Sequence, residues 1–160
     1  MGETVDIKTA QKQSEQSVLI VDDSSALRGA LRAVLQAIGV ERVIEAADAL
    51  DAIDILRSED ISLTITDWKM EPMDGLALVR AVREGAVGPN ADLPMIMLTA
   101  YDDARYQAQA MQAGVSFFLP KPFTATTLVE ALDAVSAADL SSTSLPQTNA
   151  VDPSATALQA

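Results

Sequence analysis

Five short apolar runs, each followed by a segment with helical periodicity, constrain this chain more than any other feature. The runs are Ser17–Val21, Arg42–Ala46 (the weakest of the five), Leu63–Thr66, Met95–Leu98 and Ser116–Leu119. Short continuous apolar runs are typical of strands that are buried on both faces of a parallel sheet. The sequence therefore predicts five buried strands.

The segments that follow these runs carry apolar residues at spacings of three and four, which is the period of an amphipathic helix. These residues are Leu27, Leu31, Val34, Leu35 and Ile38, then Leu50, Ile53 and Leu56, then Leu76, Val79 and Val82, then Ala104, Ala108 and Met111, and finally Leu128, Leu132 and Val135. Residues that favour a helix start precede the five segments, namely Ser24, Asp48, Asp74, the pair Asp102–Asp103, and Thr124. Because right-handed crossovers place helices on both faces of a parallel sheet, we expect an α/β fold with a doubly wound five-stranded parallel sheet.

Polar side chains come directly after four of the five predicted strands. They are Asp22 and Asp23 after the first strand, Asp67 after the third, Thr99 after the fourth and Lys121 after the fifth. Ligands of open α/β sheets bind outside the carboxyl ends of the strands, so we expect these five side chains to converge. Carboxylates held together repel one another, and an oxygen-only ligand set favours a hard divalent cation such as Mg²⁺. A lysine and a hydroxyl beside that cation suit an anionic group, most simply a phosphoryl group.

The composition excludes several classes of function. There are 11 Lys and Arg residues against 23 Asp and Glu, a formal charge of −12, whereas nucleic acids and anionic membranes attract cationic surfaces. The chain contains no cysteine and no histidine, which excludes thiolate metal sites, cysteine nucleophiles and catalysis by its own histidine. No apolar run is long enough to cross a bilayer and no secretory signal begins the chain, so we expect a cytoplasmic protein.

The composition also divides the chain into three segments. Residues 1–16 are polar and aperiodic, which predicts a flexible N-terminal arm. Residues 17–138 form the predicted folded domain. Residues 139–160 are rich in Ser, Thr and Pro without a sustained period, which predicts a disordered tail.

Four motifs in order, VDD, TDWKM, LTA and FFLPKPF, each at the end of a predicted strand, resemble the receiver domain of two-component response regulators. The resemblance covers residues 17–138 and is greatest to stand-alone receivers of the chemotaxis type. It implies a flavodoxin-like (βα)5 fold with strand order 2-1-3-4-5.

The resemblance assigns roles to residues of this sequence. It implies that Asp67 is the phosphoacceptor, that Lys121 and Thr99 contact the phosphoryl group, and that Phe118 is the switch aromatic residue. It implies a Mg²⁺ site made by Asp22 (mainly through water), Asp23, Asp67 and the backbone carbonyl of Lys69. The mouth of the site would be formed by Trp68 (partly exposed), Lys69, Ala100 and Tyr101. The Lys121–Pro122 bond would be cis.

The resemblance also implies the biological role. A histidine kinase or phosphotransfer protein would phosphorylate Asp67, and phosphorylation would switch a protein-binding surface near Tyr106, Phe118 and the helix from Thr124. The output protein is unidentified, and the chain would be a monomer or a phosphorylation-dependent dimer. It would not be an enzyme, apart from assisting its own phosphorylation and dephosphorylation.

Two other functions stay open. A receiver-like binding module that is never phosphorylated is one, although the intact set of Asp23, Asp67, Thr99 and Lys121 argues against it. A Mg²⁺-dependent phosphatase with an aspartate nucleophile is the other. Such enzymes usually carry a second aspartate two residues after the nucleophile, where this chain has Lys69.

Single residues also have simpler interpretations. Asp22 or Asp23 alone can cap the following helix, and Phe118 can be an ordinary core residue. The sequence also departs from the family pattern after Asp67, because Glu71 follows Met70 and Pro72 comes one place late.

Overall fold

The structure, a computed structural model, describes residues 16–88, 91–101 and 103–144, with side chains up to residue 136. Strands and helices alternate along these residues. The strands are β1 (Ser17–Val21), β2 (Arg42–Ala46), β3 (Leu63–Asp67), β4 (Met95–Thr99) and β5 (Phe117–Pro120). The helices are α2 (Ser25–Ala37), α3 (Ala49–Ser58), α4 (Gly75–Arg83), α5 (Ala104–Ala113) and α6 (Ala125–Ser144). The predicted order of elements is confirmed.

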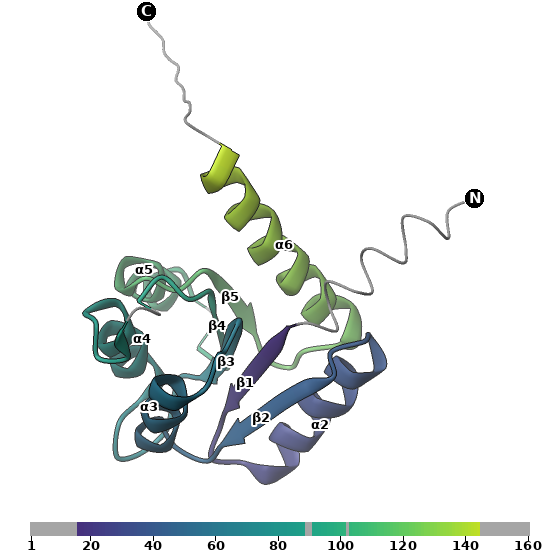
Figure 1. Cartoon of the computed structure of the whole chain (residues 1–160), viewed down its shortest axis with the longest axis horizontal. Helices are drawn as coiled ribbons and strands as arrows, with labels where there is room; N and C mark the ends of the chain where they lie inside the picture. The colour runs from purple at the N-terminus through teal and green to yellow at the C-terminus, as the bar shows by residue number, and fades with distance from the viewer. Residues whose placement is uncertain (1–15, 89–90, 102, 145–160) are drawn as a thin grey trace, which may run out of the picture.

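The strands form one parallel sheet in the order β2-β1-β3-β4-β5, as the resemblance implied. The register pairs Val18 with Leu63, Thr64 with Met95, and Ile96 with Phe117. Because all strands run in the same direction, their carboxyl ends meet at one edge. Figure 1 shows α3, α4 and α5 on one face of the sheet and α2 and α6 on the other.

Two apolar cores result from these layers, one on each face. Successive residues of a strand point to opposite faces, so Leu19 and Val21 pack toward α3 and α4, whereas Val18 and Ile20 pack toward α2 and α6. Every residue of β1, β3 and β4 is buried. This double burial explains why the strands are continuous apolar runs in the sequence.

The predicted helix starts are confirmed by side-chain caps. The hydroxyl of Ser24 accepts a hydrogen bond from the Leu27 N–H at 3.2 Å, and Asp48, Asp74 and Asp103 each accept one from the N–H three residues later. Such caps stabilise a helix by about 1 kcal/mol each. At the other end of α5, Gly114 has a φ of 114°, the left-handed conformation that ends many helices.

Two details differ from the sequence analysis. Helix α6 continues to Ser144, past residue 138, whereas the bounds of the folded domain stay a prediction. Residues 1–15 of the predicted arm and 145–160 of the predicted tail lie outside the described residues. Asp67 and Thr99 are the last residues of β3 and β4 rather than the first residues after them.

The predicted apolar face of α5 is wrong. Ala104, Ala108 and Met111 are exposed, Met111 by 47%, and the helix buries Ala110 instead. The helix is turned so that Tyr106 packs on Trp68, with ring centroids 5.4 Å apart. Leu50 in α3 is likewise 50% exposed. In both helices, packing against a neighbouring element determined the buried face.

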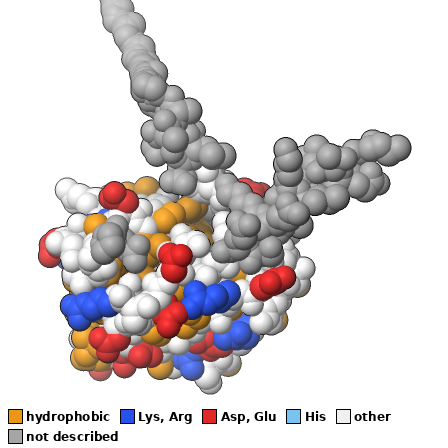
Figure 2. Space-filling model, viewed as in Figure 1, with side chains coloured by type: hydrophobic (Ala, Val, Ile, Leu, Met, Phe, Trp, Pro, Cys, Tyr) orange, Lys and Arg blue, Asp and Glu red, His pale blue; other side chains and the backbone are white. Residues whose placement is uncertain are grey.

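Charged side chains are scattered over the face of the molecule drawn in Figure 2. On the face drawn in Figure 2, basic side chains stand among acidic ones rather than in a patch of their own. None of the helices in the described part of the chain is long and apolar enough to span a membrane.

Candidate functional site

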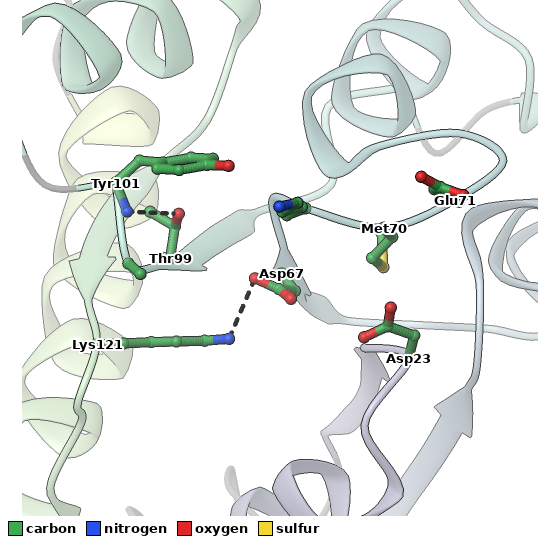
Figure 3. A pocket seen from close by; sticks show the side chains of 9 residues that line it. Asp23, Asp67, Met70, Glu71, Thr99, Tyr101 and Lys121 are labelled. Atoms are coloured by element: carbon green, nitrogen blue, oxygen red, sulfur yellow. Dashed lines mark hydrogen bonds and ion pairs between the residues drawn. The ribbon is translucent and has the colours of Figure 1, made fainter.

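A pocket of about 580 Å³ opens at the carboxyl edge of the sheet (Figure 3). It is lined by Asp23, Asp67, Lys69, Met70, Glu71, Thr99, Ala100, Tyr101 and Lys121. These residues come from the ends of β1, β3, β4 and β5, so the structure brings together side chains that lie up to about a hundred positions apart in the sequence. The predicted convergence at this edge is therefore observed.

Three carboxylates form one cluster beside this pocket. Oxygen atoms of Asp22, Asp23 and Asp67 all lie within 4.8 Å of one another. Asp22 and Asp67 are buried and Asp23 is exposed. The cluster forms because Asp22 and Asp23 follow β1 while Asp67 ends the adjacent strand β3.

Asp22 gives the strongest indication that the cluster is suited to a cation. Its Oδ1 accepts a hydrogen bond from the Ser24 N–H at 2.8 Å, whereas its Oδ2 is buried without any hydrogen-bond partner among the described residues. Burial raises the pKa of Asp22, and the negative charges of Asp67 and Asp23 raise it further against the opposing effects of the Ser24 N–H and Lys121. A cation among the three carboxylates would satisfy Oδ2 and remove the repulsion.

Lys121 supplies the positive charge that faces this cluster. Its Nζ lies 3.3 Å from Asp67 Oδ1 and 3.9 Å from Asp22 Oδ2. Its backbone N–H donates to the Thr99 carbonyl at 2.7 Å, which fixes the end of β5 against β4. The Lys121–Pro122 bond is cis, as implied. Three carboxylates and one ammonium sum to a formal charge of −2, which suits a divalent cation.

The Asp67 carboxylate is held on one oxygen. Its Oδ1 accepts a hydrogen bond from the Trp68 N–H at 2.8 Å and also faces Lys121. In the described part of the chain, Oδ2 has no hydrogen bond. Figure 3 shows this carboxylate between Lys121 on one side and Asp23 on the other. One oxygen is thus oriented while the other is left without a competing donor.

Helix α4 approaches the Asp67 backbone so closely that only glycine fits at its first residue. The Gly75 N–H donates to the Trp68 carbonyl at 2.7 Å. A Cβ atom at position 75 would lie 2.0 Å from the Asp67 carbonyl oxygen, far inside van der Waals contact. Gly75 therefore maintains the backbone position of the candidate phosphoacceptor.

Thr99 lies beside Asp67 at the end of the neighbouring strand. Its side chain is buried, and its Oγ1 accepts a hydrogen bond from the Tyr101 N–H at 3.0 Å. The hydroxyl proton stays available to donate. Ala100 and Tyr101 line the mouth as predicted, and the small Ala100 side chain is exposed.

Three residues to which the sequence analysis gave a role are not part of the pocket lining: Asp22, which lies beside it in the carboxylate cluster, Trp68 and Phe118. Trp68 was expected to be partly exposed at the mouth, but it is only 6% exposed and packs edge-on against Tyr101 and Tyr106. That expectation is wrong because the side chain after Asp67 turns into the core beneath α4 and α5. Phe118 is buried in the same core. Its position fits a core residue, and its switch role stays a prediction.

Met70 and Glu71 also line the pocket, and the sequence analysis gave them no role. Met70 is buried, whereas Glu71 is exposed. The signal in the sequence was the departure from the family pattern after Asp67, where Glu71 follows Met70 and Pro72 comes one place late.

Comparisons with known proteins agree with this geometry. The profile of the response regulator receiver domain family matches residues 18–133. A curated relative, the chemotaxis protein CheY homolog of Campylobacter jejuni, is 40% identical over 119 residues, covering 74% of this chain and 90% of the relative.

Solved structures give the same result. The chemotaxis response regulator CheY4 of Vibrio cholerae has 31% identity and a TM-score of 0.69, covering 75% of this chain and 98% of that one. A response regulator receiver protein from Pseudomonas putida has 33% identity and a TM-score of 0.67, covering 74% and 95%. The chain therefore belongs to the response regulator receiver domain family of two-component signalling.

Proposed function

We propose that this receiver domain is a phosphorylation-dependent switch in which Asp67 accepts a phosphoryl group from a histidine kinase or phosphotransfer protein. One observation carries the proposal: the Asp67 carboxylate faces an open pocket between an acidic cluster and the Lys121 ammonium group. The sequence contains no histidine, so a phosphohistidine donor would lie outside these 160 residues.

Mg²⁺ fits this site. Asp22, Asp23, Asp67 and the backbone carbonyl of Lys69 would hold it, with Asp22 acting mainly through water. The fit rests on the buried Asp22 Oδ2, which has no hydrogen bond among the described residues, and on the formal charge of the cluster. When bound, Mg²⁺ supplies positive charge that stabilises the phosphoryl oxygens during transfer.

The transfer reaction can be written with acetyl phosphate as a simple donor. An oxygen of the Asp67 carboxylate attacks phosphorus and forms a new P–O bond, while the bond between phosphorus and the acyl oxygen breaks. Acetate leaves with the electron pair, and no proton is consumed. Lys121 Nζ and the Thr99 hydroxyl donate hydrogen bonds to the transferred phosphoryl group.

A route from the site toward α5 supports the switching part of the proposal. Thr99 Oγ1 accepts from the Tyr101 N–H, and the Tyr101 ring stacks on Tyr106 of α5 with centroids 4.7 Å apart. Movement of Thr99 toward a phosphoryl oxygen would therefore displace Tyr101 and its partner. The surface near Tyr106, Phe118 and α6 would change between two states, and an output protein would bind one of them.

Phosphorylation of purified protein tests the proposal. Acetyl phosphate with Mg²⁺ should add one phosphoryl group, which intact-mass spectrometry detects and peptide mapping assigns to Asp67. Asp67→Asn keeps the shape but lacks the nucleophile and should remain unlabelled. Asp48→Asn is the matched control, because Asp48 only caps α3 and should leave labelling intact.

The competing functions give different results. Undiminished labelling of Asp67→Asn would contradict the assignment of the phosphoacceptor. Failure to accept phosphate from any donor would favour a binding module, and steady turnover of a phosphomonoester would favour a phosphatase. The cytoplasmic location and the oligomeric state stay predictions from the sequence.

A further inference from the structure

Arg28, in the second turn of α2, links the acidic cluster to the edge strand of the sheet. Its Nη1 donates a hydrogen bond to the backbone carbonyl of Asp22 at 2.6 Å, and its Nε donates to Glu45 Oε1 at 2.9 Å. The Arg28 side chain is only 16% exposed. A single guanidinium thus connects β2 to the loop that carries Asp22 and Asp23.

Strand β2 holds the backbone of Asp22 from both sides. The Asp22 N–H donates directly to the Ala46 carbonyl at 3.1 Å. The Asp22 carbonyl accepts from Arg28, which is held by Glu45, the residue before Ala46. The Asp22 carbonyl belongs to the peptide unit that joins Asp22 to Asp23, so β2 orients this unit through Arg28.

The orientation of this peptide determines where the Asp23 carboxylate points. Asp23 is exposed, and within the part of the chain that the structure describes no hydrogen bond or ion pair holds its side chain. Its direction into the pocket, visible in Figure 3, thus follows from its backbone. Of the three carboxylates in the cluster, the Asp23 carboxylate is the one whose direction depends most on the backbone conformation of its loop.

We propose that Arg28, held in place by Glu45, is a positioning residue for the divalent cation: it orients the Asp22–Asp23 peptide so that both carboxylates face the pocket. The inference rests on the proposed function, because it presupposes a cation at this cluster. Arg28 does not touch the cation. It acts through the Asp22 carbonyl, as partners of metal ligands commonly do.

The geometry requires an arginine. The planar guanidinium donates from Nε to Glu45 and from Nη1 to Asp22 at the same time. A lysine would keep the positive charge but has a single ammonium group at the end of a flexible chain. Charge and positioning can therefore be separated by substitution.

Electrostatics alone predicts that removal of Arg28 raises the Mg²⁺ affinity, which is the opposite of what the positioning role predicts. Loss of a positive charge near the cluster would strengthen the binding of a cation, since like charges repel. Loss of positioning would weaken it. The sign of the change in Mg²⁺ affinity thus discriminates between the two explanations.

The experiment is a Mg²⁺ titration of the full chain by calorimetry, with amide chemical shifts measured in parallel. Substitution of residues that support metal ligands typically lowers affinity by roughly 10–100-fold, so we expect about a tenfold loss in Arg28→Ala and a smaller loss in Arg28→Lys. Without Mg²⁺, both variants should shift the amide signals of Asp22, Asp23 and Ser24.

Arg32→Ala is the matched control. Arg32 lies on the same helix and its Nε donates to the other oxygen of Glu45 at 2.6 Å, but its bonds go to Glu45 and Val43 and not to the loop of Asp22 and Asp23. Like Arg28→Ala, the Arg32→Ala substitution removes one positive charge that pairs with Glu45. We expect Mg²⁺ affinity within about twofold of wild type and unshifted loop amides.

The outcomes separate this inference from the proposed function. Wild-type protein that bound no Mg²⁺ would refute the proposed cation site, and the inference with it. Wild-type binding together with equal or tighter binding by Arg28→Ala would overturn the positioning role alone. If Arg28→Ala failed to fold, Arg28→Lys would decide, because unchanged affinity in that variant would equally overturn it.

Discussion

Two glycine-to-alanine substitutions should change stability in opposite directions. At Gly75 an added Cβ would lie 2.0 Å from the Asp67 carbonyl oxygen, 3.0 Å from the Asp67 carbonyl carbon and 3.1 Å from the Trp68 Cα. All three are backbone atoms, so a side-chain rotation cannot relieve the overlap. The start of α4 must move away from β3.

The cost of Gly75→Ala follows from this movement. Overpacking of a close contact costs about 1–3 kcal/mol. Breaking the buried hydrogen bond from the Gly75 N–H to the Trp68 carbonyl adds about 1–3 kcal/mol if neither group finds a new partner. We expect the free energy of unfolding to fall by about 3 kcal/mol in total, and phosphorylation to slow because the Asp67 backbone shifts.

Gly29→Ala is the control for the loss of glycine itself. Gly29 lies in the middle of α2, where an added Cβ would meet no heavy atom within 4 Å. Alanine in a helix interior is more stable than glycine by about 0.5–1 kcal/mol, so this variant should gain stability.

Urea unfolding followed by circular dichroism measures both changes, and labelling by acetyl phosphate measures the effect on the site. A Gly75→Ala variant within about 0.5 kcal/mol of wild type would refute the close-approach argument, since surface changes lie in that range. The same conclusion would follow if both variants lost stability equally.

Three further predictions concern the cation, pH and the switch. In a thermal scan, Mg²⁺ should raise the melting temperature of the wild type because it binds the carboxylate cluster only in the folded state. The Asp23→Asn variant should lose most of this increase. An equal increase in both proteins would place the cation elsewhere. Hydrogen bonds from Arg32 and Arg28 lower the pKa of Glu45 below its ordinary value of 4.5, so the stability that Glu45 provides is present above about pH 4.5 and is lost as the pH falls through the lowered value. Urea unfolding of Glu45→Gln should show a shallower loss of stability over that acidic range, and identical slopes would contradict the ion pair's contribution. Beryllofluoride with Mg²⁺ should shift amide signals within residues 99–124 and barely affect Leu50–Arg57; changes restricted to the pocket would argue against output near Tyr106.

Much of the fold could be predicted because its signals are local. A strand covered on both faces is mostly apolar along its length, so Ser17–Val21 and Met95–Thr99 are recognisable as runs. A helix start needs a side-chain acceptor within three residues, so Asp48, Asp74 and Asp103 mark their helices.

The site was predictable for a related reason. In a parallel sheet every carboxyl end lies at the same edge, so a polar residue at the end of a strand is placed near the others once the strands are known. Asp23, Asp67, Thr99 and Lys121 line one pocket as a consequence. Their positions at the ends of predicted parallel strands were sufficient to group these residues.

Only the tertiary structure decided the features that depend on partners far apart in the sequence. The burial of Trp68 and the buried face of α5 depend on the contact between the Trp68 ring, which follows β3, and the Tyr106 ring of α5. The requirement for Gly75 depends on how closely α4 approaches β3, and the bond from Arg28 to the Asp22 carbonyl depends on where α2 lies relative to β2. Local patterns determine which element a residue belongs to, whereas distances of a few ångströms between elements arise from the packing of the whole domain.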